Sequence, residues 1–68
     1  MLSALRKERL LREKKLYDIS KRSGISAGRL SLIERGYAMP RWEEMRAIAH
    51  ALDVPVKLIF PPDEVSNA

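Results

Sequence analysis

The side chains of this sequence that could take part in chemistry are mainly cationic. Residues 1–35 contain ten Lys or Arg and four acidic residues, whereas residues 36–68 contain three and five. One part of the molecule would therefore attract polyanions, and an Arg there could bind phosphate oxygens or the acceptor edge of a guanine. Solvated helix faces give similar blocks of charge, so charge alone favours a nucleic-acid partner only weakly.

Other kinds of chemistry lack their usual residues. The chain has no cysteine and one histidine, His50, so thiolate sites, disulfides and a protein-only metal site are not expected. Its acidic residues form no pattern with a nucleophile or a base, and we predict no enzymatic activity, no cofactor and no metal. No apolar run is long enough for a signal peptide or a membrane span, which predicts a cytoplasmic protein without membrane contact.

Glycines and prolines divide the chain into short helical pieces, and no segment alternates apolar and polar residues as a strand would. We predict five helices, at roughly 2–14, 17–23, 27–35, 41–52 and 56–60. The expected fold is all-α, a compact bundle of five short helices that forms one domain over residues 1–60. The tail at 61–68 is expected to be disordered.

The helix predicted at 41–52 has the clearest core-facing side. At 100° per residue, one arc of this helix holds Trp42, Met45, Ile48, Ala49 and Leu52. A Trp at the start of such a stripe is interpreted as core or core edge rather than as a platform for a base.

The helix predicted at 27–35 has a second face that the core does not require. Leu30 and Ile33 point one way, and the opposite side holds Gly28, Ser31, Leu32 and Arg35. Ser26 is a good N-cap for this helix because its hydroxyl can accept from a free amide of the first turn. Gly28 costs helix stability, so its small size indicates either close approach to a partner or simple tolerance near a helix end.

The segment from Leu16 to Arg35 fits the helix-turn-helix template, in which a second helix lies in the major groove of DNA. Ser20 is small where two helices would cross, and Gly24 can adopt the left-handed conformation that ends a helix. The core side would be formed by Ile19, Ile25, Leu30 and Ile33.

A closer resemblance extends from about Leu5 to Phe60. The stretch SGISAGRLSLIERG, followed by Pro40 and EEMRAIAHALDVPVKLIF, resembles the Cro and phage-repressor family, also called the XRE-type or Cro/C1-type helix-turn-helix. The resemblance implies a lambda-repressor-like bundle whose third helix, 27–35, enters the major groove. It also implies a homodimer on an operator with two-fold symmetry.

The family's contacts with double-stranded DNA can be carried over position by position. Base contacts map onto Ala27, Gly28, Leu32, and Ser31 or Arg29. Phosphate contacts fall at the start of the second helix and after the third, which here offer Lys15, Tyr17, Ser26, Arg35, Tyr37 and Arg41. Cations and hydroxyls near helix N-termini suit this task.

Arg9 and Glu34 are expected to pair with each other, because similar proteins have such an Arg and Glu across the core. Glu34 lies near the inner side of its helix, where a partly buried acid needs a partner. Both residues are therefore assigned a structural role.

The sequence departs from the family pattern at two places. Lys15 and Leu16 stand where the family has a Ser or Thr N-cap and a Gln, so the second helix would be poorly capped or shifted. The recognition face also lacks Gln and Asn, the usual readers of adenine. Readout would then depend on Arg29 or Arg35 at guanine, on Leu32 or Ala27 at thymine methyls, and on DNA shape.

We therefore expect a sequence-specific DNA-binding transcriptional regulator, most simply a repressor. The alternative is a helix-turn-helix used for protein contact, such as an antitoxin or an adaptor, whose partner (a toxin or a co-regulator) the sequence does not identify. A homodimer is expected because one small reading face covers too few base pairs to specify a genomic site. The residues assigned to the dimer contact are Val56, Ile59 and Phe60.

Overall fold

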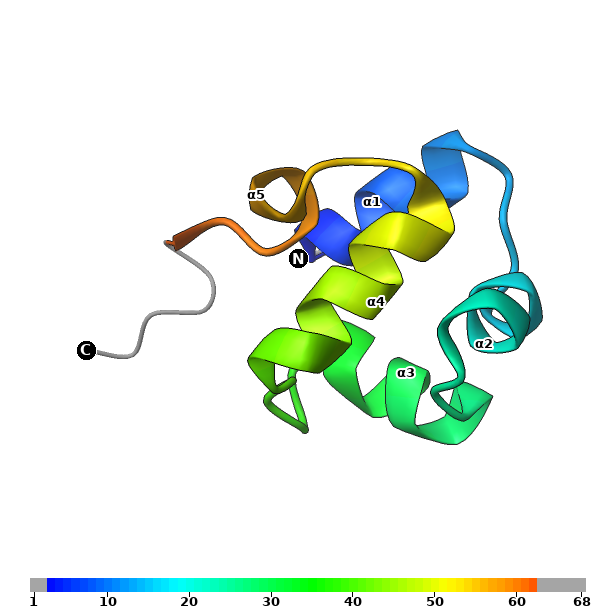
Figure 1. Cartoon of the computed structure of the whole chain (residues 1–68), viewed down its shortest axis with the longest axis horizontal. Helices are drawn as coiled ribbons and strands as arrows, with labels where there is room; N and C mark the ends of the chain where they lie inside the picture. The colour runs from blue at the N-terminus through cyan, green and yellow to red at the C-terminus, as the bar shows by residue number, and fades with distance from the viewer. Residues whose placement is uncertain (1–2, 63–68) are drawn as a thin grey trace.

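The computed structural model describes residues 3–62, which form five helices (Figure 1). The helices are α1 (Ala4–Leu11), α2 (Leu16–Ser23), α3 (Ala27–Glu34), α4 (Trp42–Leu52) and α5 (Val56–Ile59). No strand occurs among the described residues, and the prediction of an all-α bundle is confirmed. Disorder was predicted for the tail at 61–68, and residues 63–68 of it lie outside the described residues. The first helix was predicted to start at residue 2, which also lies outside them.

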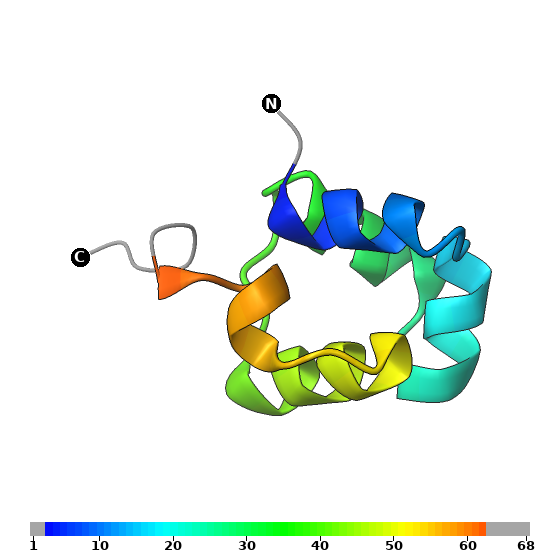
Figure 2. The same cartoon turned by 90° about the horizontal axis from the view of Figure 1, so that it is seen from above.

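The helices surround one small core. Four side chains in it are fully buried, one each from α2, α3, α4 and α5: Ile19, Leu30, Ile48 and Ile59. Figure 2 shows α1 and α4 along opposite sides of the molecule, with α2 closing one end and α5 the other. Each short helix therefore contributes a few apolar residues, and only their combination makes a core.

The apolar stripe of α4 is shorter at its N-terminal end than the sequence suggests. Ile48, Ala49 and Leu52 are buried and Met45 is half-buried, but the Trp42 side chain is 59% exposed. The prediction that Trp42 lies in or at the edge of the core is wrong. Trp42 is the first residue of α4, directly after the exposed Arg41, and the helix reaches the core only one turn later.

The first helix ends earlier than predicted, at Leu11 instead of residue 14. Arg12 is its C-cap, and Glu13 has a left-handed backbone with φ of 55°. The side chain of Arg9 donates a hydrogen bond to the carbonyl oxygen of Lys14 (2.9 Å) and so holds the chain after the helix in place. No glycine or proline marks this end, and the contact between Arg9 and the Lys14 backbone is made without either.

The last helix closes the core instead of facing outward. Ile59 is 0% exposed and Phe60 is 8% exposed, so these two residues, which were predicted to contact a second chain, offer almost no surface to one. A helix of only four residues still buries both, since it lies across α1 and α4. The apolar side chains that α5 leaves accessible are Leu58, which is exposed, and Val56, which is half-buried.

Arg9 and Glu34 form an ion pair between α1 and the end of α3. Arg9 Nε lies 2.6 Å from Glu34 Oε2, and Arg9 Nη2 lies 3.0 Å from Oε1. The two side chains are only 11% and 4% exposed. The hydrogen bonds that Arg9 donates to Glu34 raise the pKa of Arg9, against the opposing effect of burial. The geometry places the two residues as the family resemblance implied.

Replacing Glu34 with Ala should destabilise the protein by about 1–4 kcal/mol, because Arg9 would be left largely buried without its partner. Thermal or urea unfolding monitored by circular dichroism measures the loss. The matched control is Arg12→Ala, which breaks the more exposed pair between Arg12 and Glu8 within α1 and should cost at most about 1 kcal/mol. Equal losses for the two variants would show that burial adds nothing to the Arg9–Glu34 pair.

Candidate nucleic-acid interface

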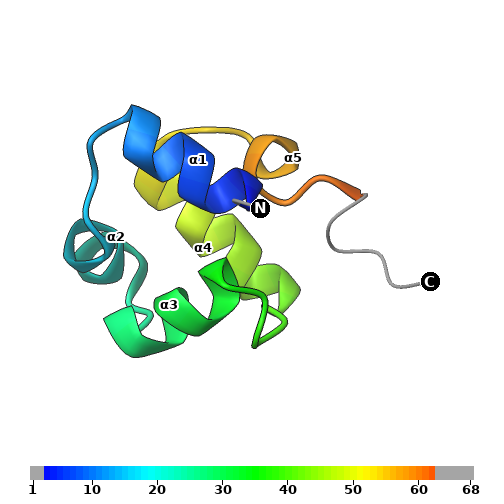
Figure 3. The ribbon, with the colours of Figure 1, turned by 180° about the vertical axis from the view of Figure 1, so that it is seen from behind.

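A short turn sets the direction of α3 after α2. Gly24 ends α2 in the left-handed conformation, with φ of 79°, and its N–H donates to the carbonyl oxygen of Ser20. Two residues later Ser26 begins α3, and its Oγ accepts a hydrogen bond from the backbone N–H of Arg29 (3.1 Å). The turn places α3 at the edge of the molecule, on the side away from α5, as Figures 1 and 3 show.

The two sides of α3 differ in exposure. Leu30, Ile33 and Glu34 are buried. Of the residues predicted to contact bases, Ala27, Gly28 and Leu32 are exposed and lie on one helix, and Ser31 beside them is half-buried. A side chain at position 28 would meet no atom of the protein within 4 Å, so packing within the domain does not require glycine there.

The N-termini of α2 and α4 share an unusual arrangement. Their N-cap residues, Lys15 and Arg41, are exposed cations whose side chains have no hydrogen-bond acceptor. In each case the acid three residues later accepts from the N-cap N–H at 2.8 Å, Asp18 for α2 and Glu44 for α4. The first-turn amides are thus left without a capping side chain and stand next to a positive charge, an arrangement suited to binding an anion.

Two exposed tyrosines lie beside cations, one in α2 and one in the loop after α3. Lys21 Nζ is 5.4 Å from the ring centre of Tyr17 in α2. Arg35 stacks its guanidinium over Tyr37, at 5.3 Å, in the loop after α3. This loop folds back on α3, because Tyr37 N–H donates to the carbonyl oxygen of Leu32 (2.8 Å) and Gly36 takes a φ of 83°. The predicted phosphate contacts therefore lie in the helix before α3 and in the segment that follows it.

Arg29, the other residue predicted to contact a base, is paired inside the protein. Its Nε lies 2.6 Å from Glu44 Oε2 and its Nη2 lies 2.8 Å from Glu44 Oε1. The hydrogen bonds from Arg29, followed by that from the Arg41 N–H, lower the pKa of Glu44 to about 2, and the same pairing raises the pKa of Arg29. The guanidinium fork is engaged by a carboxylate and does not extend freely from the recognition face.

Three residues near this surface have contacts or an exposure that were not predicted from the sequence. Glu44 stands three residues after Arg41, which is the capping-box spacing and could have suggested its contact with the Arg41 amide. Nothing local in the sequence indicated its pairing with Arg29. Met39 and Trp42 are exposed beside the loop, where the periodicity of α4 had favoured burial for Trp42.

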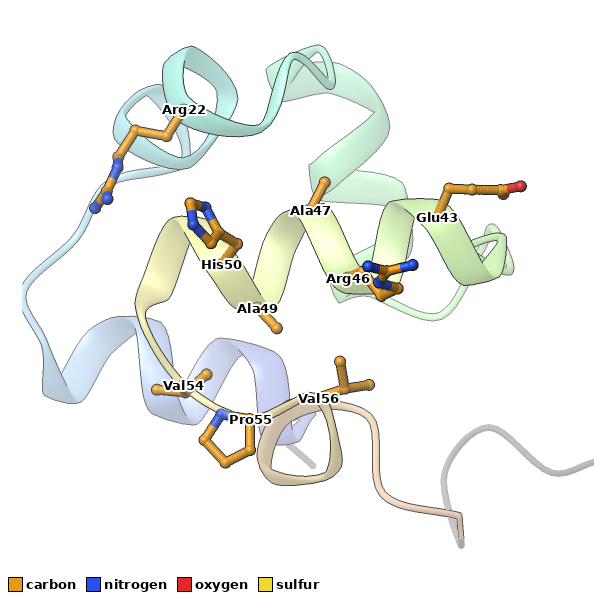
Figure 4. Close-up of a pocket in the computed structure, with 9 residues that line it drawn as sticks. All are labelled: Arg22, Glu43, Arg46, Ala47, Ala49, His50, Val54, Pro55 and Val56. Carbon is orange, nitrogen blue, oxygen red and sulfur yellow. The ribbon is translucent and has the colours of Figure 1, made fainter.

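An open groove lies on another face of α4, between the end of α2 and the segment before α5 (Figure 4). Arg22, Arg46 and His50 line it together with Val54, Pro55 and Val56. Of the residues predicted to contact DNA, none lines this groove, so it is separate from the α3 surface. Within residues 3–62, no group of acidic or histidine side chains could hold a metal ion, and no helix is long and apolar enough to cross a membrane.

An exposed helix set by a tight turn, with cations and uncapped helix ends around it, defines a DNA-binding helix-turn-helix domain. A family model described as helix-turn-helix matches residues 5–59. The chain belongs to this family, the Cro/C1-type or XRE-type helix-turn-helix, whose members are DNA-binding transcription regulators. No curated protein and no solved structure matched the chain.

Acid should weaken the contribution of Glu44 to stability. Its pKa is about 2 in the folded protein against an ordinary value of 4.5, so the unfolded chain binds the proton more readily between these values. The stabilisation is complete above about pH 5 and disappears as the pH falls towards 2. The difference in melting temperature between the native protein and Glu44→Gln should therefore be largest at neutral pH and shrink towards pH 2.

Circular dichroism melts of both proteins between pH 2 and 7 measure this difference. Glu43→Gln is the matched control, since Glu43 is an exposed neighbour in the same helix turn. A difference between native protein and Glu44→Gln that stayed constant over this range would contradict the assignment.

Proposed function

We propose that this domain binds a specific double-stranded DNA sequence as a homodimer and acts as a transcriptional repressor, with α3 in the major groove. The observation that carries the proposal is the exposed side of α3, together with the exposed cations at which the helices before and after it, α2 and α4, begin. A groove of DNA presents its bases between two phosphate backbones, so a reading helix needs phosphate contacts on both sides.

Base reading is assigned to Ala27, Gly28, Ser31 and Leu32. Leu32 is 40% exposed and can bury its methyl groups against a thymine methyl, as can the smaller Ala27. Gly28 leaves open space above the helix, which would let the backbone approach the base edges closely. The Ser31 hydroxyl can donate to or accept from a base edge.

Phosphate binding is assigned to two clusters. Lys15 and Tyr17 lie at the start of α2, and the Ser26 hydroxyl at the start of α3 can donate to a phosphate while its oxygen caps α3. Arg35, Tyr37 and Arg41 lie after α3 and at the start of α4. All of these except Ser26 carry a charge or a phenol on an exposed side chain, and the amides of α2 and α4 add to the attraction.

A second candidate function is contact with another protein through the same face. Exposed large apolar side chains gather around the end of α3 and the following loop: Leu32, Tyr37, Met39 and Trp42. Such a cluster is also typical of a protein interface. Salt separates the two functions, because binding through several phosphates weakens steeply with salt concentration and an apolar contact does not.

The dimer contact is reassigned to the accessible side of α5. Leu58 is exposed and Val56 is half-buried, and Val56 borders the groove of Figure 4. A self-complementary contact of these residues would place two copies of α3 on successive turns of one DNA face, about 34 Å apart. The operator would then read as an inverted repeat.

Selection of bound sequences from a random DNA pool, at a fixed salt concentration, tests the function directly. We expect enrichment of an inverted repeat. If no sequence is enriched and an apolar protein partner is bound instead at high salt, the second candidate function replaces the first.

Arg35→Ala and Leu32→Ala form a matched pair that separates positioning from reading. Arg35→Ala should weaken binding to selected and unrelated DNA equally, and should reduce the salt slope by roughly one unit. Leu32→Ala should lose about 1–3 kcal/mol at one base pair of the selected sequence and leave binding to unrelated DNA intact. Binding isotherms at several salt concentrations measure both effects, and an exchange of the two patterns would reverse the assignment.

Leu58→Asp should convert cooperative binding of two half-sites into independent binding, because a carboxylate would be buried in the contact between the two chains. Footprinting of an operator with two half-sites measures the change. Lys57→Ser alters the neighbouring exposed residue of α5 and should keep cooperativity. Full cooperativity of Leu58→Asp would exclude this face as the dimer contact.

A further inference from the structure

The guanidinium of Arg29 connects the recognition helix to the start of α4. Arg29 lies in the first turn of α3, and its two hydrogen bonds to Glu44, at 2.6 and 2.8 Å, cross to the first turn of α4. Glu44 Oε1 also accepts the backbone N–H of Arg41 at 2.8 Å. One carboxylate thus joins a side chain of α3 to the backbone at which α4 begins, and we call this set of contacts the α3–α4 bridge.

The α3–α4 bridge lies at the start of α4, where few apolar side chains are buried. In the segment before α4, Ala38 is half-buried and Pro40 is buried, but Met39 and Arg41 are exposed, as is Trp42, the first residue of α4. The helix that packs most closely against α3 is α2, and the core contacts of α4 begin only after its first turn. The position of Arg41 relative to α3 therefore depends largely on polar contacts, among which the Arg29–Glu44 ion pair has the shortest distance.

If Arg29 left Glu44 to bind a base, the negative charge of Glu44 would lie near the DNA backbone without its partner. Glu44 lies beside Arg41, which is assigned to a phosphate, so without Arg29 its carboxylate would lie near the DNA backbone with no side-chain cation bound to it. Its low pKa, about 2, keeps it ionised at neutral pH. Pairing with Arg29 offsets this repulsion, which favours retention of the bridge in the complex.

We propose that Arg29 is a positioning residue that stays bound to Glu44 on DNA and holds the Arg41 phosphate contact at a fixed distance from the base-reading side of α3. A preformed distance lets both contacts form without an ordering cost at the moment of binding. This inference rests on the proposed function, and it removes Arg29 from the residues that read bases.

Three variants test the proposal: Arg29→Ala, Glu44→Gln and the double variant. Each should lose roughly tenfold in affinity for the selected sequence at a temperature where it is fully folded, with no change in base preference. The double variant should lose no more than either single variant, because all three remove the same ion pair between Arg29 and Glu44. Arg46→Ala is the matched control for loss of one positive charge, since Arg46 lies in the separate groove of Figure 4, and it should lose less.

Other outcomes would overturn the proposal in distinct ways. If Arg29→Ala changed the preference at one base pair while Glu44→Gln bound as well as the native protein, Arg29 would be a base reader. If the double variant recovered native affinity, Arg29 would only neutralise Glu44.

A measurement without DNA tests the bridge on its own. Hydrogen exchange of the Arg41 amide, followed by NMR, should be faster in both single variants, and the emission of Trp42, the next residue, should shift. Unchanged exchange in Arg29→Ala would overturn the bridge and leave the proposed function intact. Failure to select any DNA sequence would overturn the proposed function, and with it the role of the bridge in DNA binding.

Discussion

The ion pair of Arg9 and Glu34 lies where α1, the connection to α2 and the end of α3 meet. Arg9 binds Glu34 through two nitrogens, and through its third it binds the carbonyl oxygen of Lys14. A single guanidinium therefore ends α1, positions the chain that leads into α2 and holds the last turn of α3. Few apolar residues are available in so small a domain, and this directional contact determines how the short helices are placed around them.

The recognition helix is held at both ends by charge and in the middle by apolar packing. Glu34 fixes its last turn to α1, Arg29 fixes its first turn to α4, and Leu30 and Ile33 bury the side between them. Both carboxylates are bound to guanidinium groups, so neither presents an unpaired negative charge at the exposed side of α3. The same pairs that position the helix thus also preserve a surface that an anion can approach.

The sequence predicted the parts of the fold that local rules determine. Gly24 and Ser26 mark the turn and the start of α3, and both boundaries are confirmed because a left-handed glycine and a capping hydroxyl act within a few residues. Periodicity identified the inner side of α4 but not how far the rest of the core extends along this helix. Trp42 was therefore predicted to be buried, although it is exposed. The burial of Ile59 and the partner of Arg29 depend on residues far away in the chain, and no local pattern encodes them.

The departures from the family pattern at Lys15 and Leu16 acquire a physical meaning from the structure. A Ser or Thr at the N-cap would stabilise α2 by accepting a hydrogen bond from one of its free backbone amides. The Lys15 side chain cannot accept this hydrogen bond. Asp18 compensates in part, because it accepts from the Lys15 N–H and places a negative charge near the positive end of the helix dipole. Arg41 and Glu44 repeat the arrangement at α4. Both helices thus begin with a cation in place of a capping side chain, which reduces helix stability and increases the attraction for a phosphate at the start of α2 and of α4.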